Sequence, residues 1–189
     1  GVMADWFNSC VQRSGVKCLF VAGLLSQCAF LRVLPGFCPA IDTRWPDGGL
    51  PLLKPVVVLG DAVPPAATRY ADFLAGGANA GDLPLDTVQP DDVLLMQFTS
   101  GTTSYPKGVM LTHDNMLRNA AYIARRFNCE AGDRYFSARP FYHVAGSTLS
   151  LLAALTSGAC LSSTPTFDAG DALRGMREER GRLTSGNEP

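Results

Sequence analysis

The stretch DVLLMQFTSGTTSYPKGVMLT, residues 92 to 112, places a polar loop between two apolar segments. The segments Asp92 to Phe98 and Val109 to Thr112 are predicted to be strands. A helix is predicted directly after them, from Asp114, which can cap it, to about Phe127. Strands that are joined by a loop and followed by a helix are typical of α/β proteins.

The rest of the chain repeats this alternation of strands and helices. Further helices are predicted at 4–14, 24–34, 144–156 and 168–180, and Asp168 can cap the last of them. Further strands are predicted at 17–22, 55–60, 134–138 and 159–162. The prolines between Pro35 and Pro55 favour a surface loop. We therefore expect an α/β fold, a layered α/β sandwich with a largely parallel sheet.

Composition excludes several classes of function. The 189 residues carry a net charge of −1, so the chain has no basic surface of the kind that binds nucleic acid. Hydrophobic residues make up 47% of the chain, which excludes disorder and suffices for one or two domains. The sequence shows no secretory signal, and its longest near-apolar stretch, Cys18 to Leu31, is too short for a transmembrane segment. We expect a cytoplasmic location.

The six cysteines do not form a metal-binding pattern. None of them belongs to a C-x-x-C pair, and only His113 and His143 could complete a site, so no metal ligand is predicted. Cys18, Cys28 and Cys160 lie in apolar runs, where a buried, reduced thiol is the default.

The loop from Thr99 to Gly108 carries the strongest chemical signal. Hydroxyl groups and loop amides donate hydrogen bonds to phosphate, and Gly101 allows the backbone to approach closely. Lys107 adds a mobile positive charge that suits a polyphosphate. The hydroxyls lie within five residues: Thr99, Ser100, Thr102 and Thr103. The loop is not a Walker P-loop, since Lys107 precedes Gly108 and no Ser or Thr follows for magnesium. From composition alone, a solvated loop between two strands remains an alternative.

Phe98 to Gly108 (FTSGTTSYPKG), with Val109 to His113 and Asn115, resembles the phosphate-loop signature of the adenylate-forming (AMP-binding) superfamily, which includes the acyl-CoA synthetases. Pro140 to Gly146 (PFYHVAG) is similar to a second motif of that family. Ser104 departs from the pattern, because the family usually has glycine there. If that position needs a positive φ, serine strains the loop by roughly 1 kcal/mol or more.

The resemblance implies a two-step reaction. A carboxylic acid, fatty or of another kind, attacks ATP to give an acyl-adenylate and pyrophosphate, and the thiol of coenzyme A then displaces AMP. The substrates would be the acid, ATP with Mg²⁺, and coenzyme A. The resemblance implies phosphate binding by Thr99, Ser100, Gly101, Thr102, Thr103 and Lys107. It also implies that Lys107 and His143 are catalytic, and that Tyr142, His143 and Gly146 line the acyl-adenylate pocket.

Members of the family are longer and carry later motifs that are absent from this sequence. We therefore expect residues 1–189 to form part of the N-terminal domain, without the C-terminal domain, and to be inactive alone. Two alternatives stay open: a non-catalytic nucleotide-binding remnant, and an adenylation domain that feeds a carrier protein. For His143 the residues alone also allow a core histidine, and for His113 a structural role. The sequence does not specify an oligomeric state.

Overall fold

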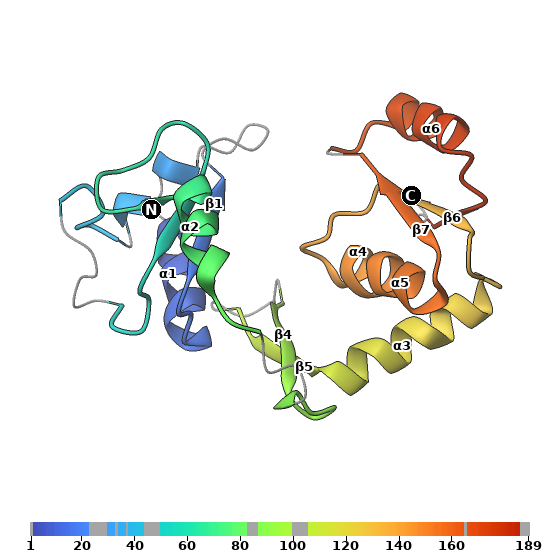
Figure 1. Cartoon of the computed structure of the whole chain (residues 1–189), viewed down its shortest axis with the longest axis horizontal. Helices are drawn as coiled ribbons and strands as arrows, with labels where there is room; N and C mark the ends of the chain where they lie inside the picture. The colour runs from blue at the N-terminus through green and yellow to red at the C-terminus, as the bar shows by residue number, and fades with distance from the viewer. Residues whose placement is uncertain are drawn as a thin grey trace. The chain divides into compact units, whose positions relative to one another are not determined.

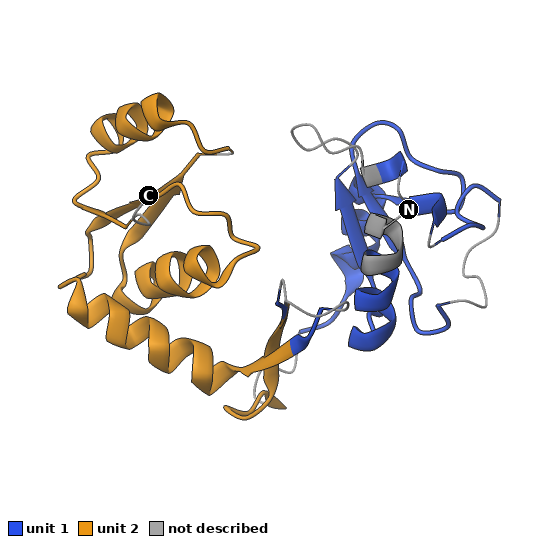
Figure 2. Ribbon diagram, turned by 180° about the vertical axis from the view of Figure 1, so that it is seen from behind, with its two compact units in different colours: residues 1–86, 98–108 blue, residues 87–97, 109–189 orange. Residues whose placement is uncertain are grey.

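The computed structural model describes residues 2–22, 30–32, 34–36, 38–43, 50–82, 87–99, 106–164 and 166–185. The chain divides into two compact units (Figure 2). Unit 1 comprises residues 1–86 and 98–108, and unit 2 comprises residues 87–97 and 109–189. Each unit contains a three-stranded sheet whose paired strands are parallel, together with helices, which confirms the α/β class. The parallel strands thus form two small sheets.

Unit 1 has the sheet order β1-β2-β3, with β1 (Leu19–Ala22), β2 (Val56–Leu59) and β3 (Thr68–Arg69). Leu19 pairs with Val56 and Ala22 with Leu59 in parallel register. Helix α1 (Val2–Ser14) precedes the sheet, and α2 (Tyr70–Gly76) with the short 3₁₀ turn η3 (Gly77–Asn79) follows it (Figure 1). The predictions of a first helix and of strands at 17–22 and 55–60 are confirmed.

The core of unit 1 forms around β2, whose Val56, Val57 and Val58 are fully buried. On β1, the Phe20 ring makes edge contacts with the rings of Tyr70 and Phe73 of α2, at centroid distances of 6.5 and 5.3 Å. These contacts hold α2 against the sheet, since aromatic pairs favour such edge-to-face geometry.

The prediction of a surface loop from Pro35 to Pro55 is wrong for several of its residues. Cys38, Ile41, Leu50 and Leu53 are buried and belong to the same core cluster as Val56. Prolines disfavour helix and strand, but they do not prevent the apolar side chains between them from turning inward.

The predicted helix from Leu24 to Leu34 lies largely outside the described residues. Within it the structure describes one 3₁₀ turn, η1 (Phe30–Arg32), and the start of a second, η2 (Leu34–Gly36).

Strands β4 (Val93–Phe98) and β5 (Gly108–Thr112) form a separate hairpin. At one end the Thr99 N–H donates to the Lys107 carbonyl oxygen at 2.9 Å, and at the other the His113 N–H donates to the Asp92 carbonyl oxygen at 3.1 Å. This register, across so short a connection, makes the pair antiparallel. Residues 98–108, the tip of the hairpin, are assigned to unit 1 and its base to unit 2.

Unit 2 has the sheet order β7-β6-β8, with β6 (Arg134–Ser137), β7 (Cys160–Ser163) and β8 (Leu183–Thr184). Figure 1 shows α6 (Ala169–Glu178) on one side of this sheet and α4 (Val144–Gly146) and α5 (Ala153–Ser157) on the other. The π-helical segment η5 (Ser147–Leu152) joins α4 to α5, and both η5 and α5 pack on α3 (His113–Arg126).

Neighbouring side chains of β6 reach opposite layers of unit 2, as the alternation of a strand requires. The Tyr135 hydroxyl donates to the Leu149 carbonyl oxygen of η5 at 3.1 Å. Phe136 faces α6, where a Cβ on Gly175 would lie only 2.6 Å from its ring. The glycine inside the predicted last helix therefore makes room for Phe136.

The helix caps agree only in part with the sequence prediction. Asp168 caps α6, as predicted, by accepting a hydrogen bond from the Asp171 N–H at 2.9 Å. Helix α3, however, is capped by Thr112 and not by Asp114. Thr112 and Asn115 form a reciprocal capping box, because each side-chain oxygen accepts from the other residue's N–H.

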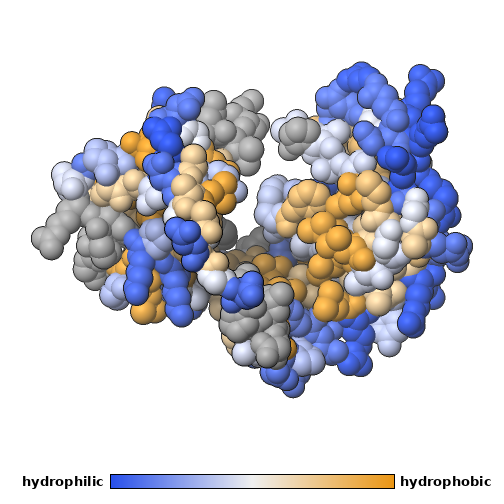
Figure 3. All heavy atoms as spheres, in the orientation of Figure 1, coloured by the Kyte–Doolittle hydropathy of each residue, from blue (hydrophilic) through white to orange (hydrophobic). Residues whose placement is uncertain are grey.

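The surface of unit 2 includes apolar side chains that gather over α4 and α5 (Figure 3). Val144 and Leu155 are among the exposed large hydrophobic residues there. Of the helices in the described part of the chain, none has the length and apolar character needed to cross a membrane.

Candidate active site

The hairpin brings together the two ends of the predicted phosphate loop. The Thr99 N–H donates to the Lys107 carbonyl oxygen at 2.9 Å, so these two residues lie side by side. Pro106 is buried, whereas the side chains of Thr99 and Lys107 are exposed. Ser100, Gly101, Thr102, Thr103 and Ser104 lie outside the described residues.

Thr112, His113 and Asn115, which belong to the end of the first motif, form the start of α3. The capping box fixes where α3 begins, immediately after the hairpin. His113 is the first residue of α3, and its N–H closes the base of the hairpin on Asp92. This placement agrees with the structural alternative for His113.

The second motif forms a tight turn, residues 140–146, that leads into α4. We call these residues the His143 turn. The His143 N–H donates to the Pro140 carbonyl oxygen at 3.1 Å, and the Gly146 N–H donates to the His143 carbonyl oxygen at 2.9 Å. His143 is also the N-cap of α4, since its Nδ1 accepts from the Ala145 N–H at 3.1 Å.

This cap determines the chemistry that the ring of His143 offers. A neutral imidazole that accepts through Nδ1 carries its proton on Nε2. His143 is exposed as a residue, and in this tautomer Nε2–H is the hydrogen-bond donor of its ring. The core-histidine alternative therefore does not apply to this residue. The neighbouring Tyr142 side chain is 87% exposed, so it lies on the surface of unit 2.

Gly146 is buried where backbone segments approach closely. A Cβ at this position would lie 2.2 Å from the Pro140 carbonyl oxygen and 2.9 Å from the Phe141 nitrogen. Real Cβ atoms essentially never come so near to other heavy atoms. Glycine here allows the His143 turn to close.

A buried pair of serines, which the motifs do not indicate, is hydrogen-bonded to the His143 turn. The Arg139 N–H donates to Ser137 Oγ at 3.2 Å, Ser137 Oγ donates to Ser150 Oγ at 2.9 Å, and Ser150 Oγ donates to the Ala145 carbonyl oxygen at 3.0 Å. Ser137 and Ser150 are fully buried. Ser150 belongs to η5, and such π-helical insertions are frequent near functional sites.

The predicted residues thus form two groups. Thr99 and Lys107 lie at the tip of the hairpin in unit 1, whereas Tyr142, His143 and Gly146 lie together in unit 2. Gln97 of β4 is a further residue that the motifs did not indicate. Its Nε2 donates to the Tyr142 carbonyl oxygen at 2.8 Å.

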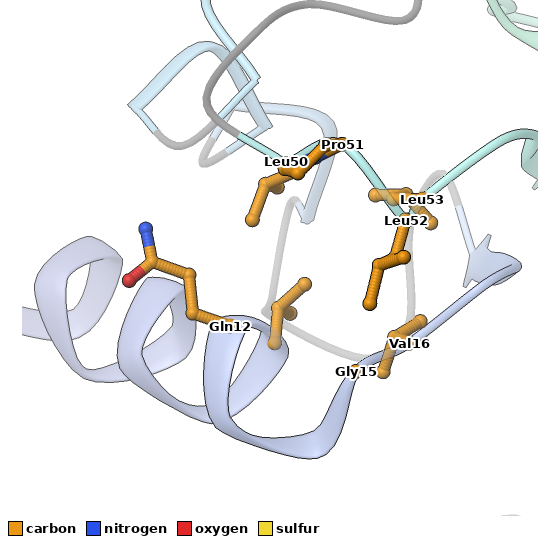
Figure 4. A pocket seen from close by; sticks show the side chains of 8 residues that line it. Gln12, Gly15, Val16, Leu50, Pro51, Leu52 and Leu53 are labelled. Carbon is orange, nitrogen blue, oxygen red and sulfur yellow. The ribbon is translucent and has the colours of Figure 1, made fainter.

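A small cavity of about 210 Å³ lies elsewhere, in unit 1 between the end of α1 and residues 50–53 (Figure 4). Its lining is apolar apart from the side chain of Gln12. None of the predicted site residues lines it.

The cysteines differ in their exposure to solvent. Cys160 is exposed, which corrects the expectation that it is buried, whereas Cys10 and Cys38 are buried. Burial raises the pKa of the Cys10 thiol, against the opposing charge of Arg13, and burial also raises the pKa of Cys18. Cys28 lies outside the described residues. Among the residues that are described, no three His, Cys, Asp or Glu side chains come together to hold a metal ion.

The chain is similar to known proteins in both sequence and fold. A family model described as AMP-binding enzyme matches residues 7–186. A substituted indenyl-propanoyl:CoA ligase of Mycobacterium tuberculosis is 36% identical over 180 residues, which cover 92% of this chain and 32% of that protein. An acyl-CoA ligase of Ajellomyces capsulatus is 35% identical over 128 residues, which cover 67% of this chain and 20% of that protein.

Among solved structures, the anthranilate CoA ligase AuaEII in complex with anthranoyl-AMP superimposes with a TM-score of 0.76 at 18% identity. The match covers 96% of this chain and 32% of that one. The chain therefore spans about a fifth to a third of the length of these relatives.

Proposed function

The chain belongs to the AMP-binding enzyme family, and from that premise we propose that it is part of an ATP-dependent carboxylate–CoA ligase. A carboxylate oxygen would attack the α-phosphorus of ATP, which expels pyrophosphate and leaves an acyl-adenylate. The thiol of coenzyme A would then attack the acyl carbon and expel AMP. A carboxylate oxygen is a poor leaving group, and the first step replaces it with a good one.

We assign the phosphate-binding role to the loop that the hairpin closes. The observation that carries this assignment is the Thr99–Lys107 hydrogen bond, which joins the ends of the TSGTTSYPKG segment and leaves Lys107 exposed. Lys107 would offset the charge that develops on the departing pyrophosphate, with help from Thr99, Ser100, Gly101, Thr102 and Thr103. Such electrostatic stabilisation is usually the largest contribution to a reaction with little covalent protein chemistry.

We assign the acyl-adenylate junction to the His143 turn. The support is the cap on Nδ1, which leaves the exposed Nε2–H as a donor for an oxygen of the adenylate. Tyr142 would border the acyl group through its exposed ring. Gly146 would act indirectly, because its missing Cβ allows the turn to close.

Mg²⁺ would enter as part of the ATP substrate. The described part of the chain offers no cluster of carboxylates that fits the ion, so we derive no step through it. We further propose that residues 1–189 form part of the N-terminal domain of the ligase. The acid would be a fatty or other carboxylic acid, and the enzyme would act in the cytoplasm.

The test begins with ATP binding by the 189-residue chain, measured calorimetrically with Mg²⁺. We expect weak binding that weakens further with salt, because the contact is mainly electrostatic. Lys107→Ala should reduce the affinity, whereas Lys17→Ala, which removes another exposed lysine of unit 1, should not. Equal affinities for the two variants would remove Lys107 from the site.

Activity is tested in the full-length protein by acid-dependent pyrophosphate exchange. Loss of one such donor costs about 1–3 kcal/mol of transition-state stabilisation, so Lys107→Ala should slow exchange roughly 5- to 160-fold. The 189-residue chain alone should release no AMP above its Lys107→Ala control when given ATP, Mg²⁺, coenzyme A and fatty acids.

A further inference from the structure

Gln97 connects the two motifs of the candidate site. It lies on β4, two positions before Thr99, and its Nε2 donates to the Tyr142 carbonyl oxygen at 2.8 Å, across 45 positions of sequence. Both ends of this hydrogen bond belong to unit 2. The strand that enters the phosphate loop is therefore bonded directly to the His143 turn.

The orientation of the Gln97 amide follows from its surroundings. Oε1 is buried and finds no hydrogen-bond partner among the described groups. Turning the amide over would place Oε1 against the Tyr142 carbonyl oxygen, so that two acceptors would face each other, and would leave the NH₂ group buried without an acceptor. The Tyr142 carbonyl thus selects the orientation in which Gln97 donates.

The Tyr142 carbonyl belongs to the peptide group whose nitrogen is that of His143. Because a peptide group is planar, the bond from Gln97 to its oxygen also fixes the direction of the His143 N–H, which donates to Pro140. The ring is held in turn by the Ala145 N–H on Nδ1. The amide of Gln97 therefore sits at the start of a continuous set of bonds that ends at the imidazole.

We propose that Gln97 is a positioning residue, which holds the Tyr142–His143 peptide group against β4 and thereby keeps His143 with Nδ1 capped and Nε2–H exposed. Its importance for catalysis rests on the proposed function, but its effect on His143 does not. Gln97 acts through the backbone and touches no substrate in this scheme.

The experiment uses the whole chain, in which His113 and His143 are the two histidines. Imidazole ¹⁵N spectra report the protonated nitrogen of each ring, and amide hydrogen exchange reports the Ala145 N–H that donates to His143 Nδ1. Gln97→Met removes the donor at similar length, and Gln97→Glu replaces it with an acceptor. Gln89→Glu is the matched control, because Gln89 is exposed, also belongs to unit 2 and makes only a local side-chain contact.

In both Gln97 variants we expect the Ala145 amide to lose at least about tenfold in protection, and the His143 nitrogens to shift towards a mixture of tautomers. His113 and the Asn115 amide in the capping box of α3 should stay as in the wild-type chain, and Gln89→Glu should change nothing. Unchanged His143 and Ala145 signals in Gln97→Met would overturn the proposal. So would an equal loss at His113 and Asn115, because Gln97 would then only hold the unit together.

ATP binding separates this inference from the proposed function. Gln97→Met should bind ATP within about twofold of wild type, since it leaves Lys107 in place. If Lys107→Ala has no effect on ATP affinity while Gln97→Met still releases His143, the proposed function fails and the positioning role stands. If Lys107→Ala weakens ATP binding and Gln97→Met leaves His143 unchanged, the proposed function stands and the positioning role of Gln97 fails.

Discussion

Replacement of Gly146 by alanine tests the geometry of the His143 turn. Two physical effects predict changes of opposite sign in the free energy of unfolding. Gly146 has helical torsions, φ −82° and ψ −48°, so alanine gains about 1 kcal/mol from helix propensity. The added Cβ, however, would lie 2.2 Å from the Pro140 carbonyl oxygen, and about 1.2 Å of movement is needed to reach ordinary contact. The atoms in the way belong to backbone and cannot rotate aside.

Overpacking of this kind costs typically 1–3 kcal/mol and occasionally more. The clash involves three backbone atoms within 3.0 Å, so we place the cost at the upper end and the net loss at about 2 kcal/mol. For a chain of this size that loss lowers the Tm by about 4–8 °C, which circular dichroism can follow. Gly76→Ala in α2 is the control, since nothing lies within 4 Å of its Cβ and it should be neutral or stabilising. A Tm for Gly146→Ala at or above that of wild type would refute the close approach.

Three further predictions concern unit 2. Ser150→Ala should lower the free energy of unfolding by about 1–3 kcal/mol, because the buried Ala145 carbonyl oxygen loses its side-chain donor. An unchanged midpoint of denaturant unfolding would show that the serine pair does not stabilise the turn. Asp133→Asn should destabilise the chain at neutral pH but not in strong acid. The hydrogen bond from Arg182 lowers the pKa of Asp133, so the stabilisation that the carboxylate provides is lost as the pH falls through that lowered pKa; a loss of stability that is the same at both pH values would contradict this. Thr112→Ala should cost about 0.5–2 kcal/mol by loss of the cap on α3, and retention of full helix content and stability would show that the cap is dispensable.

Much of the fold could be predicted from the sequence, because apolar runs and caps are local signals. The valines of β2 and the Asp168 cap of α6 needed no knowledge of the rest of the chain. Burial in the proline-rich segment could not be found in the same way. Cys38 and Ile41 occur without a helical or strand repeat, so their burial depends on packing against α1 and β2, which the local pattern does not encode.

Some residues of the candidate site also have local sequence signals, whereas others depend on tertiary contacts. Lys107 and His143 lie in contiguous motifs, and their roles were predicted from the resemblance of those motifs to a family; these roles stay predictions. Gln97 and Ser150 donate to backbone carbonyl oxygens, and Ser137 donates to Ser150. Every residue except proline has the same backbone groups, so a bond to a carbonyl gives no sequence signal. Such supports become visible only when hydrogen-bond partners are known.

The His143 turn needs these distant supports because it has little stability of its own. Residues 140–142 precede His143, the N-cap of the continuous helical stretch formed by α4, η5 and α5, so they lie outside its regular hydrogen bonds. The orientation of the turn therefore depends on individual bonds, which include Gln97 on the Tyr142 carbonyl and Ser150 on the Ala145 carbonyl. Between these points the Nδ1 of His143 is already engaged, so in its proposed role His143 would need little reorganisation when a ligand binds at Nε2–H. That economy is what electrostatic catalysis requires of a donor, which must be in place before charge develops.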